Sequence, residues 1–406
     1  MPPISLNSVL DPPEHELLLC CARTQLTPET AERICALAGR QLDWEYLFQL
    51  ASRHKLSPLL CWQLKTVAAE LVPPPIHEQL RTSLSAISRR NLQLAAELLQ
   101  LLQLFHDHDI SAIPYKGAVL AETVYGNLAL REFVDLDVLV RKRDVLSARD
   151  LLIARGYHPF VQLEASQETA YLDYQCEHVL SDDRRDLMVE IQWRIVPDYF
   201  SFPFDYECLW RRIEPATLCQ RSIATLSPED TLLLLCVHGS KHLWARLGWI
   251  CDVAEAVRHF QPRLNWPLLE QRAVHSGSQR MLYLGLFLAH DLLQAELPPD
   301  VRQQVNADGA VKSLAEQVYA QLWTEAEEQD ETANFFEHSF FHLKAKERWQ
   351  DRLRFCVRVL TTTTIEDWSA NGDFQSVPLA AQVRRTLRLA RKYLPQLVRL
   401  LVKRAA

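Results

Sequence analysis

Three acidic residues in this sequence have the types and the spacing of a metal-binding site. Asp135 and Asp137 are two residues apart in the apolar segment 133–140, whose branched residues and alternation predict a strand. Side chains two positions apart on a strand project from the same face, so the two carboxylates would lie together. Glu190 stands between branched apolar residues in a second predicted strand and is the natural third acid.

Carboxylates arranged in this way are typical ligands of Mg²⁺ or Mn²⁺. Magnesium prefers oxygen donors and commonly binds one or two carboxylates together with the phosphates of a substrate. A pair of such ions can activate an attacking hydroxyl and stabilise a leaving pyrophosphate. An isolated Asp-x-Asp is also common as a solvated surface pair, so the surrounding residues must decide between the two interpretations.

The residues upstream of the aspartates favour phosphate binding. Lys116 and Gly117 join a short predicted strand to a predicted helix, and the free backbone N–H groups at a helix start can receive phosphate oxygens. Arg131 lies four residues before Asp135. Its guanidinium would either neutralise phosphate or pair with a neighbouring acid, Glu132 or Asp135.

A second candidate set lies on a later predicted helix. His238 and His242 are four residues apart and share one helical face, which is also the spacing of the zinc-binding HExxH motif. The residues between them include Lys241 and no glutamate, and a lysine beside two imidazoles disfavours a bound cation. Either these side chains face a ligand, or the histidines are structural.

The elements expected to position these residues form three successive regions. Residues 1–108 are predicted as a helical region, because apolar positions recur at three- and four-residue spacing. Residues 109–225 are predicted as a mixed αβ core, and residues 226–406 as a second helical region. The expected fold class is α+β, with a small mixed sheet flanked by helical regions and helix predominant overall.

Local signals within these regions predict three further features. The prolines within 72–75 would separate two helical hairpins. The segment 177–193 fits a hairpin of strands around a polar turn. Ser227 and Pro228 supply an N-cap hydroxyl and a proline for the start of the following helix.

The bulk composition indicates a folded protein with no overall attraction to nucleic acid. The 406 residues are 48% hydrophobic and 23% charged, with a formal net charge of −7. The ten cysteines are dispersed and predicted to be buried free thiols, and no apolar run is long enough to span a membrane. We expect a cytoplasmic protein. The basic segment 384–404 would be able to contact an anionic surface.

The segment from Tyr115 to Asp137 combines these features in a recognisable order. A strand is followed by Lys116-Gly117, a helix, Tyr125-Gly126, Arg131 and the Asp-x-Asp pair. This arrangement resembles the polymerase-β-like nucleotidyltransferase superfamily, and within it a family of uncharacterised nucleotidyltransferases that carries Lys-Gly at the loop. Further blocks that look like this family extend the resemblance over nearly the whole chain, at 44–60, 238–252 and 352–368.

The resemblance implies roles for individual residues. Asp135, Asp137 and Glu190 would be the catalytic metal ligands. Gly117 would let the backbone approach a triphosphate. The superfamily usually has Gly-Gly or Gly-Ser at this loop, so Lys116 is a departure that would either contact phosphate or point away. The histidine helix would face the same cleft, with Lys241 meeting phosphate and His238 or His242 stacking on a base or ribose.

The reaction implied is transfer of a nucleoside monophosphate from a nucleoside triphosphate such as ATP, with Mg²⁺ or Mn²⁺ and release of pyrophosphate. The acceptor is left open among a sugar, a small metabolite, a protein side chain and an RNA end. Two alternatives also stay open. One is a catalytically inactive nucleotide-binding or regulatory protein of the same fold, and the other is a partner-binding scaffold whose acids are only solvated.

Overall fold

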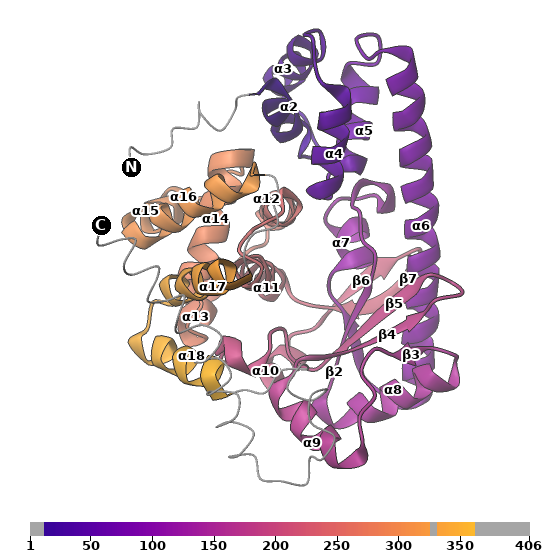
Figure 1. Ribbon diagram of the computed structural model, residues 1–406, viewed down its shortest axis with the longest axis vertical. Coiled ribbons are helices and arrows are strands. Elements are labelled where there is room, and N and C mark those ends of the chain that lie inside the picture. Colours follow the sequence, from indigo (N-terminus) through magenta and orange to yellow (C-terminus); the bar gives the residue numbers. More distant parts are fainter. Residues whose placement is uncertain (1–11, 325–330, 362–406) are drawn as a thin grey trace.

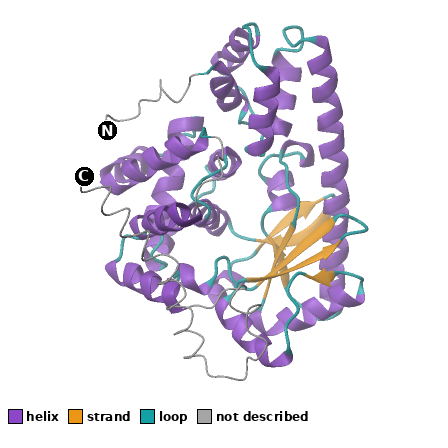
Figure 2. Cartoon of the chain, viewed as in Figure 1, coloured by secondary structure: helices purple, strands orange, loops and turns teal. Residues whose placement is uncertain are grey.

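The computed structural model describes residues 12–324 and 331–361 and has the predicted α+β class (Figures 1 and 2). The chain begins with helices α2 (Pro13–Cys21), α3 (Pro28–Ala38), α4 (Trp44–Arg53), α5 (Ser57–Val67) and α6 (Pro74–Asp107). Side chains cap two of these helices: the Thr27 hydroxyl accepts from the N–H of Thr30, and the Asp43 carboxylate accepts from the N–H of Tyr46.

The prediction of two helical hairpins around the prolines is wrong. Four helices precede the proline run, and a single helix of 34 residues, α6, begins within it at Pro74. No glycine or further proline occurs between Ile76 and Asp107, so nothing in this stretch favours a turn. In Figure 1, α6 runs beside α5 at one end and beside the sheet at the other.

The central sheet has five strands in the order β1-β2-β5-β4-β3. Strands β2 and β5 are parallel, and β4 and β5 form the predicted antiparallel hairpin. In this register Asp137 stands opposite Glu190, and Glu177 stands opposite Gln192. The strands are β1 (Ala112–Pro114), β2 (Leu136–Val140), β3 (His158–Pro159), β4 (Glu177–Asp182) and β5 (Leu187–Gln192).

Asp135 lies just before β2 and not inside it, which corrects the predicted strand over 133–140. The pairing of β5 with β2 begins at Leu136, and that of β1 reaches only as far as Val138. Residues 133–135 therefore have no strand beside them to continue the ladder.

Short helices and a hairpin complete the αβ region. The predicted helix after Lys116 is α7, and Gly156, which follows α8, has φ 97°, as expected of a glycine that ends a helix. The two-stranded hairpin β6–β7 was not predicted. The elements are α7 (Gly117–Thr123), η1 (Leu128–Leu130), η2 (Lys142–Asp144), α8 (Val145–Ala154), α9 (Ala165–Tyr174), η3 (Asp198–Phe200), α10 (Tyr206–Trp210), β6 (Glu214–Leu218) and β7 (Arg221–Thr225).

The last region is helical, as predicted, and its first helix begins at the predicted cap, where the Ser227 hydroxyl accepts from the N–H of Asp230. The basic segment 384–404 lies outside the described residues. The helices are α11 (Pro228–Lys241), α12 (Leu247–Phe260), α13 (Trp266–His275), α14 (Gln279–Leu293), α15 (Pro299–Ala307), α16 (Gly309–Leu322), α17 (Glu331–Ala345) and α18 (Trp349–Thr361).

Two hydrophobic cores hold the elements together. One buries side chains of α2 to α5 against those of α11, α12 and α14. The other buries the sheet against α8 and the second half of α6. Helix α6 contributes Leu80 to the first core and Leu94 to Phe105 to the second. The N-terminal helices and the C-terminal helices thus share a core, although the αβ region separates them in sequence.

His54 joins the N-terminal helices to the start of α12. Its ring nitrogen Nδ1 accepts from the backbone N–H of Leu247 at 3.1 Å, and its carbonyl accepts from that of Gly248 at 3.0 Å. These bonds satisfy two N–H groups that the first turn of a helix leaves without a partner. His54 is fully buried, and burial, together with the charge of Arg53, lowers its pKa to about 3, so the ring is neutral and able to accept.

We expect Gly248→Ala to destabilise the protein. A Cβ at position 248 would lie 2.7 Å from the His54 carbonyl oxygen, which is backbone and cannot rotate away. Overpacking of this kind costs about 1–3 kcal/mol. Urea denaturation measures the effect, and Gly309→Ala is the matched control, because nothing lies within 4 Å of the Cβ it adds. Equal stability of the two variants would contradict the prediction.

The cysteine prediction holds in part. All ten cysteines are free, but only five are buried, and Cys219 and Cys356 are exposed. Among the described residues, no helix combines the length and the apolar character needed to cross a membrane.

Candidate active site

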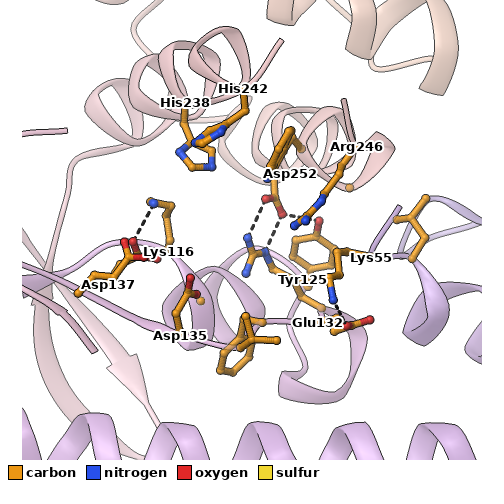
Figure 3. A pocket seen from close by; sticks show the side chains of 18 of the residues that line it. Lys55, Lys116, Tyr125, Glu132, Asp135, Asp137, His238, His242, Arg246 and Asp252 are labelled. Carbon is orange, nitrogen blue, oxygen red and sulfur yellow. Dashed lines mark hydrogen bonds and ion pairs between the residues drawn. The ribbon is translucent and has the colours of Figure 1, made fainter. Parts of the chain in front are cut away.

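A pocket of about 260 Å³ lies where the sheet, α11, α12 and the turn between α4 and α5 meet (Figure 3). Every candidate residue from the sequence borders it: Asp135, Asp137, Glu190, Lys116, Gly117, Arg131, His238, Lys241 and His242. Residues that the sequence analysis did not propose as ligand-binding or catalytic also line it, among them Lys55, Glu132, Glu177, Gln192, Arg246, Trp249 and Asp252.

The three acids converge on this pocket. The register of β2 and β5 sets Asp137 beside Glu190, and Asp135 enters from the segment before β2. Burial, reinforced by the charge of Asp137, raises the pKa of Asp135 and raises that of Glu190 to about 8. The acidic groups therefore lie close enough to repel one another as carboxylates, and a positive charge beside them stabilises their ionised forms.

Lys116 supplies positive charge directly. Its Nζ lies 2.8 Å from Asp137 Oδ1, and this ion pair is visible in Figure 3. The side chains are 10% and 5% exposed. Burial acts to lower the pKa of Lys116, but the neighbouring acidic groups, Asp137 first among them, together outweigh it, and the pKa is raised well above its usual value. Lys116 thus points into the carboxylate cluster and not away from it.

Gln192 is a polar residue of the acid cluster that the sequence analysis missed. Its side-chain amide donates to Asp137 and to Glu190, and its carbonyl accepts from the hydroxyl of Tyr115. Gln192 is two residues after Glu190 on the same strand, so alternation alone would have placed it on the acidic face. Glu177, opposite it on β4, adds a fourth carboxylate to the pocket lining.

Arg131 pairs with neither of the two acids expected from the sequence, Glu132 and Asp135. Its Nε and Nη2 donate to the two carboxylate oxygens of Asp252 on α12, at 2.7 and 2.8 Å. The Tyr125 hydroxyl donates to the same carboxylate at 2.7 Å. Glu132, one of the two expected partners, accepts instead from Lys55. Arg131 therefore ties the segment before β2 to the C-terminal helices.

His238 and His242 form an uncharged wall opposite the acids (Figure 3). Their rings lie 4.6 Å apart and both contact Trp249. Burial lowers the pKa of His238 well below its usual value, with the charge of Lys116 the next cause. Burial and the charge of Lys241 lower the pKa of His242 to about 3. Both rings are therefore neutral at physiological pH and can hydrogen-bond a ligand without adding charge.

Within residues 12–324 and 331–361, no three His, Cys, Asp or Glu side chains stand at coordination distance from a common point. At the acids, Lys116 Nζ and Gln192 Nε2 both donate to the same oxygen of Asp137, Oδ1. The donors themselves, carboxylate oxygens from adjacent strands, suit Mg²⁺ or Mn²⁺. A divalent cation would take the place of the Lys116 ammonium beside Asp137.

Gly117 has φ 53° at the point where the loop enters α7. A side chain is strained in this backbone conformation, which explains the glycine. A Cβ here would lie 3.5 Å from the Asp135 carbonyl oxygen and 3.6 Å from the Phe133 ring, so the glycine packs against the segment that carries Asp135.

The profile of a protein family described as uncharacterised nucleotidyltransferase matches residues 40–294, well over half of the chain. The matched range includes every residue that lines the pocket. Neither the curated proteins nor the solved structures contain a match.

Proposed function

Because the chain belongs to the uncharacterised nucleotidyltransferase family, we propose that it transfers a nucleoside monophosphate from a nucleoside triphosphate to an acceptor, and that it does so in this pocket. The observation that carries the proposal is the cross-strand pair of Asp137 and Glu190, with Asp135 beside it and the Lys116 ammonium among the carboxylates. Carboxylate oxygens are the ligands that Mg²⁺ and Mn²⁺ prefer, and a neighbouring ammonium can contact phosphate.

Asp135, Asp137 and Glu190 would hold Mg²⁺ or Mn²⁺. When bound, such an ion neutralises the triphosphate and favours attack by the acceptor hydroxyl or amine. The protein's own residues position the reactants. The Lys116 ammonium, which pairs with Asp137, would be available to contact the phosphates wherever a cation holds that carboxylate, and the phosphates would lie near the backbone of Gly117. Lys241 contributes a second ammonium on the opposite wall.

The nucleoside is best accommodated against α11 and α12. The neutral rings of His238 and His242 and the half-buried indole of Trp249 offer flat surfaces for a base and hydrogen bonds for a ribose. Arg246 lies over the Trp249 ring at 5.4 Å and extends this surface.

Replacement of Lys116 tests the proposal that its ammonium pairs with Asp137 in the free protein and contacts phosphate when nucleotide binds. We expect Lys116→Met to bind Mn²⁺ alone more tightly than the wild type, because no ammonium competes for Asp137. The same variant should bind Mg²⁺–ATP about 10–100-fold more weakly, the usual effect of losing a charged hydrogen bond. Titration calorimetry measures both affinities, and Lys142→Met, which removes an exposed lysine paired with Asp173, is the control. If both affinities change in the same direction, Lys116 does not exchange Asp137 for phosphate.

Two measurements test the proposed function. Mg²⁺ together with a nucleoside triphosphate should raise the melting temperature of the protein more than either alone. Mass spectrometry of a cell lysate incubated with the protein, Mg²⁺ and labelled nucleotides should then reveal an acceptor that has gained a nucleotide mass. Binding without transfer to any acceptor favours the inactive nucleotide-binding alternative, and the absence of both effects favours a partner-binding scaffold.

A further inference from the structure

Gln192 hydrogen-bonds to three carboxylates of the pocket. Its Nε2 lies 2.8 Å from Asp137 Oδ1, 2.9 Å from Glu190 Oε2 and 3.4 Å from Glu177 Oε2. The side chain is 2% exposed, so water hardly competes for these bonds. An amide NH₂ group carries two hydrogens and no net charge. It therefore holds the carboxylates near one another without cancelling the charge that a cation would meet.

The hydroxyl of Tyr115 determines which end of this amide faces the acids. Tyr115 Oη lies 2.5 Å from Gln192 Oε1 and is buried together with it. Burial raises the pKa of Tyr115 well above its usual value, so the hydroxyl keeps its proton and donates. A flipped amide would present its oxygen to the Asp137 carboxylate, which repels it. The bond donated by Tyr115 and the charge of Asp137 thus favour the same orientation.

The contacts of Tyr115 and Lys116 meet at the Asp137 carboxylate. Tyr115 and Lys116 are consecutive residues after β1, and both act on Asp137: Lys116 directly, and Tyr115 through Gln192. The ammonium can be exchanged for a cation or for phosphate. The amide is buried between β2 and β4 and has no comparable freedom to leave.

We propose that Gln192, orientated by Tyr115, is a positioning residue that sets the spacing of the Asp137 and Glu190 carboxylates and thereby the affinity of the site for a divalent cation. This inference rests on the proposed function, because it assumes that these carboxylates bind such a cation. Loss of a residue that orients metal ligands typically weakens metal binding about 10–100-fold.

The test is Mn²⁺ binding to the full chain, measured by electron paramagnetic resonance. Gln192→Met keeps the length of the side chain and removes the amide, and we expect it to bind Mn²⁺ about 10–100-fold more weakly than the wild type. Tyr115→Phe removes only the hydroxyl and should weaken binding by less. Because Tyr115 acts through Gln192, adding Tyr115→Phe to Gln192→Met should change the affinity no further.

A matched control separates positioning from general loss of stability. Tyr157→Phe removes another buried tyrosine hydroxyl of the αβ region, one that donates to Glu97 at 2.9 Å and lies outside the pocket. It should bind Mn²⁺ like the wild type, even if its melting temperature falls as far as that of Tyr115→Phe.

The outcomes separate this inference from the proposed function. If the wild type binds no Mn²⁺, with or without nucleotide, the metal site of the proposed function is wrong and the inference is lost with it. If the wild type binds Mn²⁺ and both Gln192→Met and Tyr115→Phe bind it equally well, the positioning role alone is overturned. Additive effects of the two substitutions would show that Tyr115 does not act through Gln192.

Discussion

Asp135→Asn combined with Asp137→Asn should abolish nucleotide transfer while the fold survives. The two substitutions keep the size of each side chain and remove both charges that would hold the cation. Loss of electrostatic stabilisation at a single position of an active site costs about 10²–10³-fold in rate, so we expect the double variant to lose at least about a thousandfold. Transfer of labelled nucleotide measures the loss.

The fold should survive with some loss of stability. The substitutions leave the buried Lys116 ammonium without Asp137, but Glu190 and Glu177 remain in the pocket to balance its charge. Asp183→Asn, in the exposed turn between β4 and β5, is the control and should keep full activity. If the double variant is active, these aspartates are not required for transfer.

Asp252→Ala should be among the most destabilising single substitutions in the protein. The side chain of Asp252 is 4% exposed, and its carboxylate accepts both bonds of Arg131 and that of Tyr125. Its removal leaves the buried guanidinium of Arg131 without a countercharge, and breaking a buried pair in this way costs about 3–5 kcal/mol. The free energy of unfolding in urea measures the loss.

A second substitution distinguishes this explanation from a simple loss of packing. Arg131→Met in the Asp252→Ala background removes the unpaired guanidinium charge, so it should restore part of the lost stability. Tyr125→Phe, which removes one hydrogen bond and no charge, should cost about 0.5–1.5 kcal/mol. If the double variant is no more stable than Asp252→Ala alone, an unpaired guanidinium is not the cause.

The acid cluster could be predicted because it depends on short-range rules. Alternation along a strand placed Glu190 on one face, and two adjacent strands were enough to bring it beside Asp137. The helix start at Ser227 followed from the cap and the proline next to it. The class of fold followed in the same way from periodicity.

The partners across the pocket could not be predicted, because they come from distant parts of the chain. Asp252 is 121 residues from Arg131, and the Glu132 carboxylate is paired by a lysine 77 residues before it. No local pattern links such positions. Asp135 illustrates another limit, since the start of β2 is set by where its neighbours begin to pair and not by its own composition.

Gln192 was missed for a different reason. Its position followed from the same alternation that placed Glu190, but an uncharged amide gave no chemical reason to select it. Only its bonds to Asp137, Glu190 and Tyr115 reveal its place in the site.

The most direct test compares two radioactive forms of one nucleoside triphosphate, labelled in the α-phosphate or in the γ-phosphate, with Mg²⁺ and a lysate as the source of acceptor. We predict that the α-label becomes attached to the acceptor, that the γ-label is released in pyrophosphate, and that neither occurs with the Asp135→Asn, Asp137→Asn variant. Attachment of the γ-label to the acceptor, or equal transfer by the variant, would contradict nucleotidyl transfer by these acids.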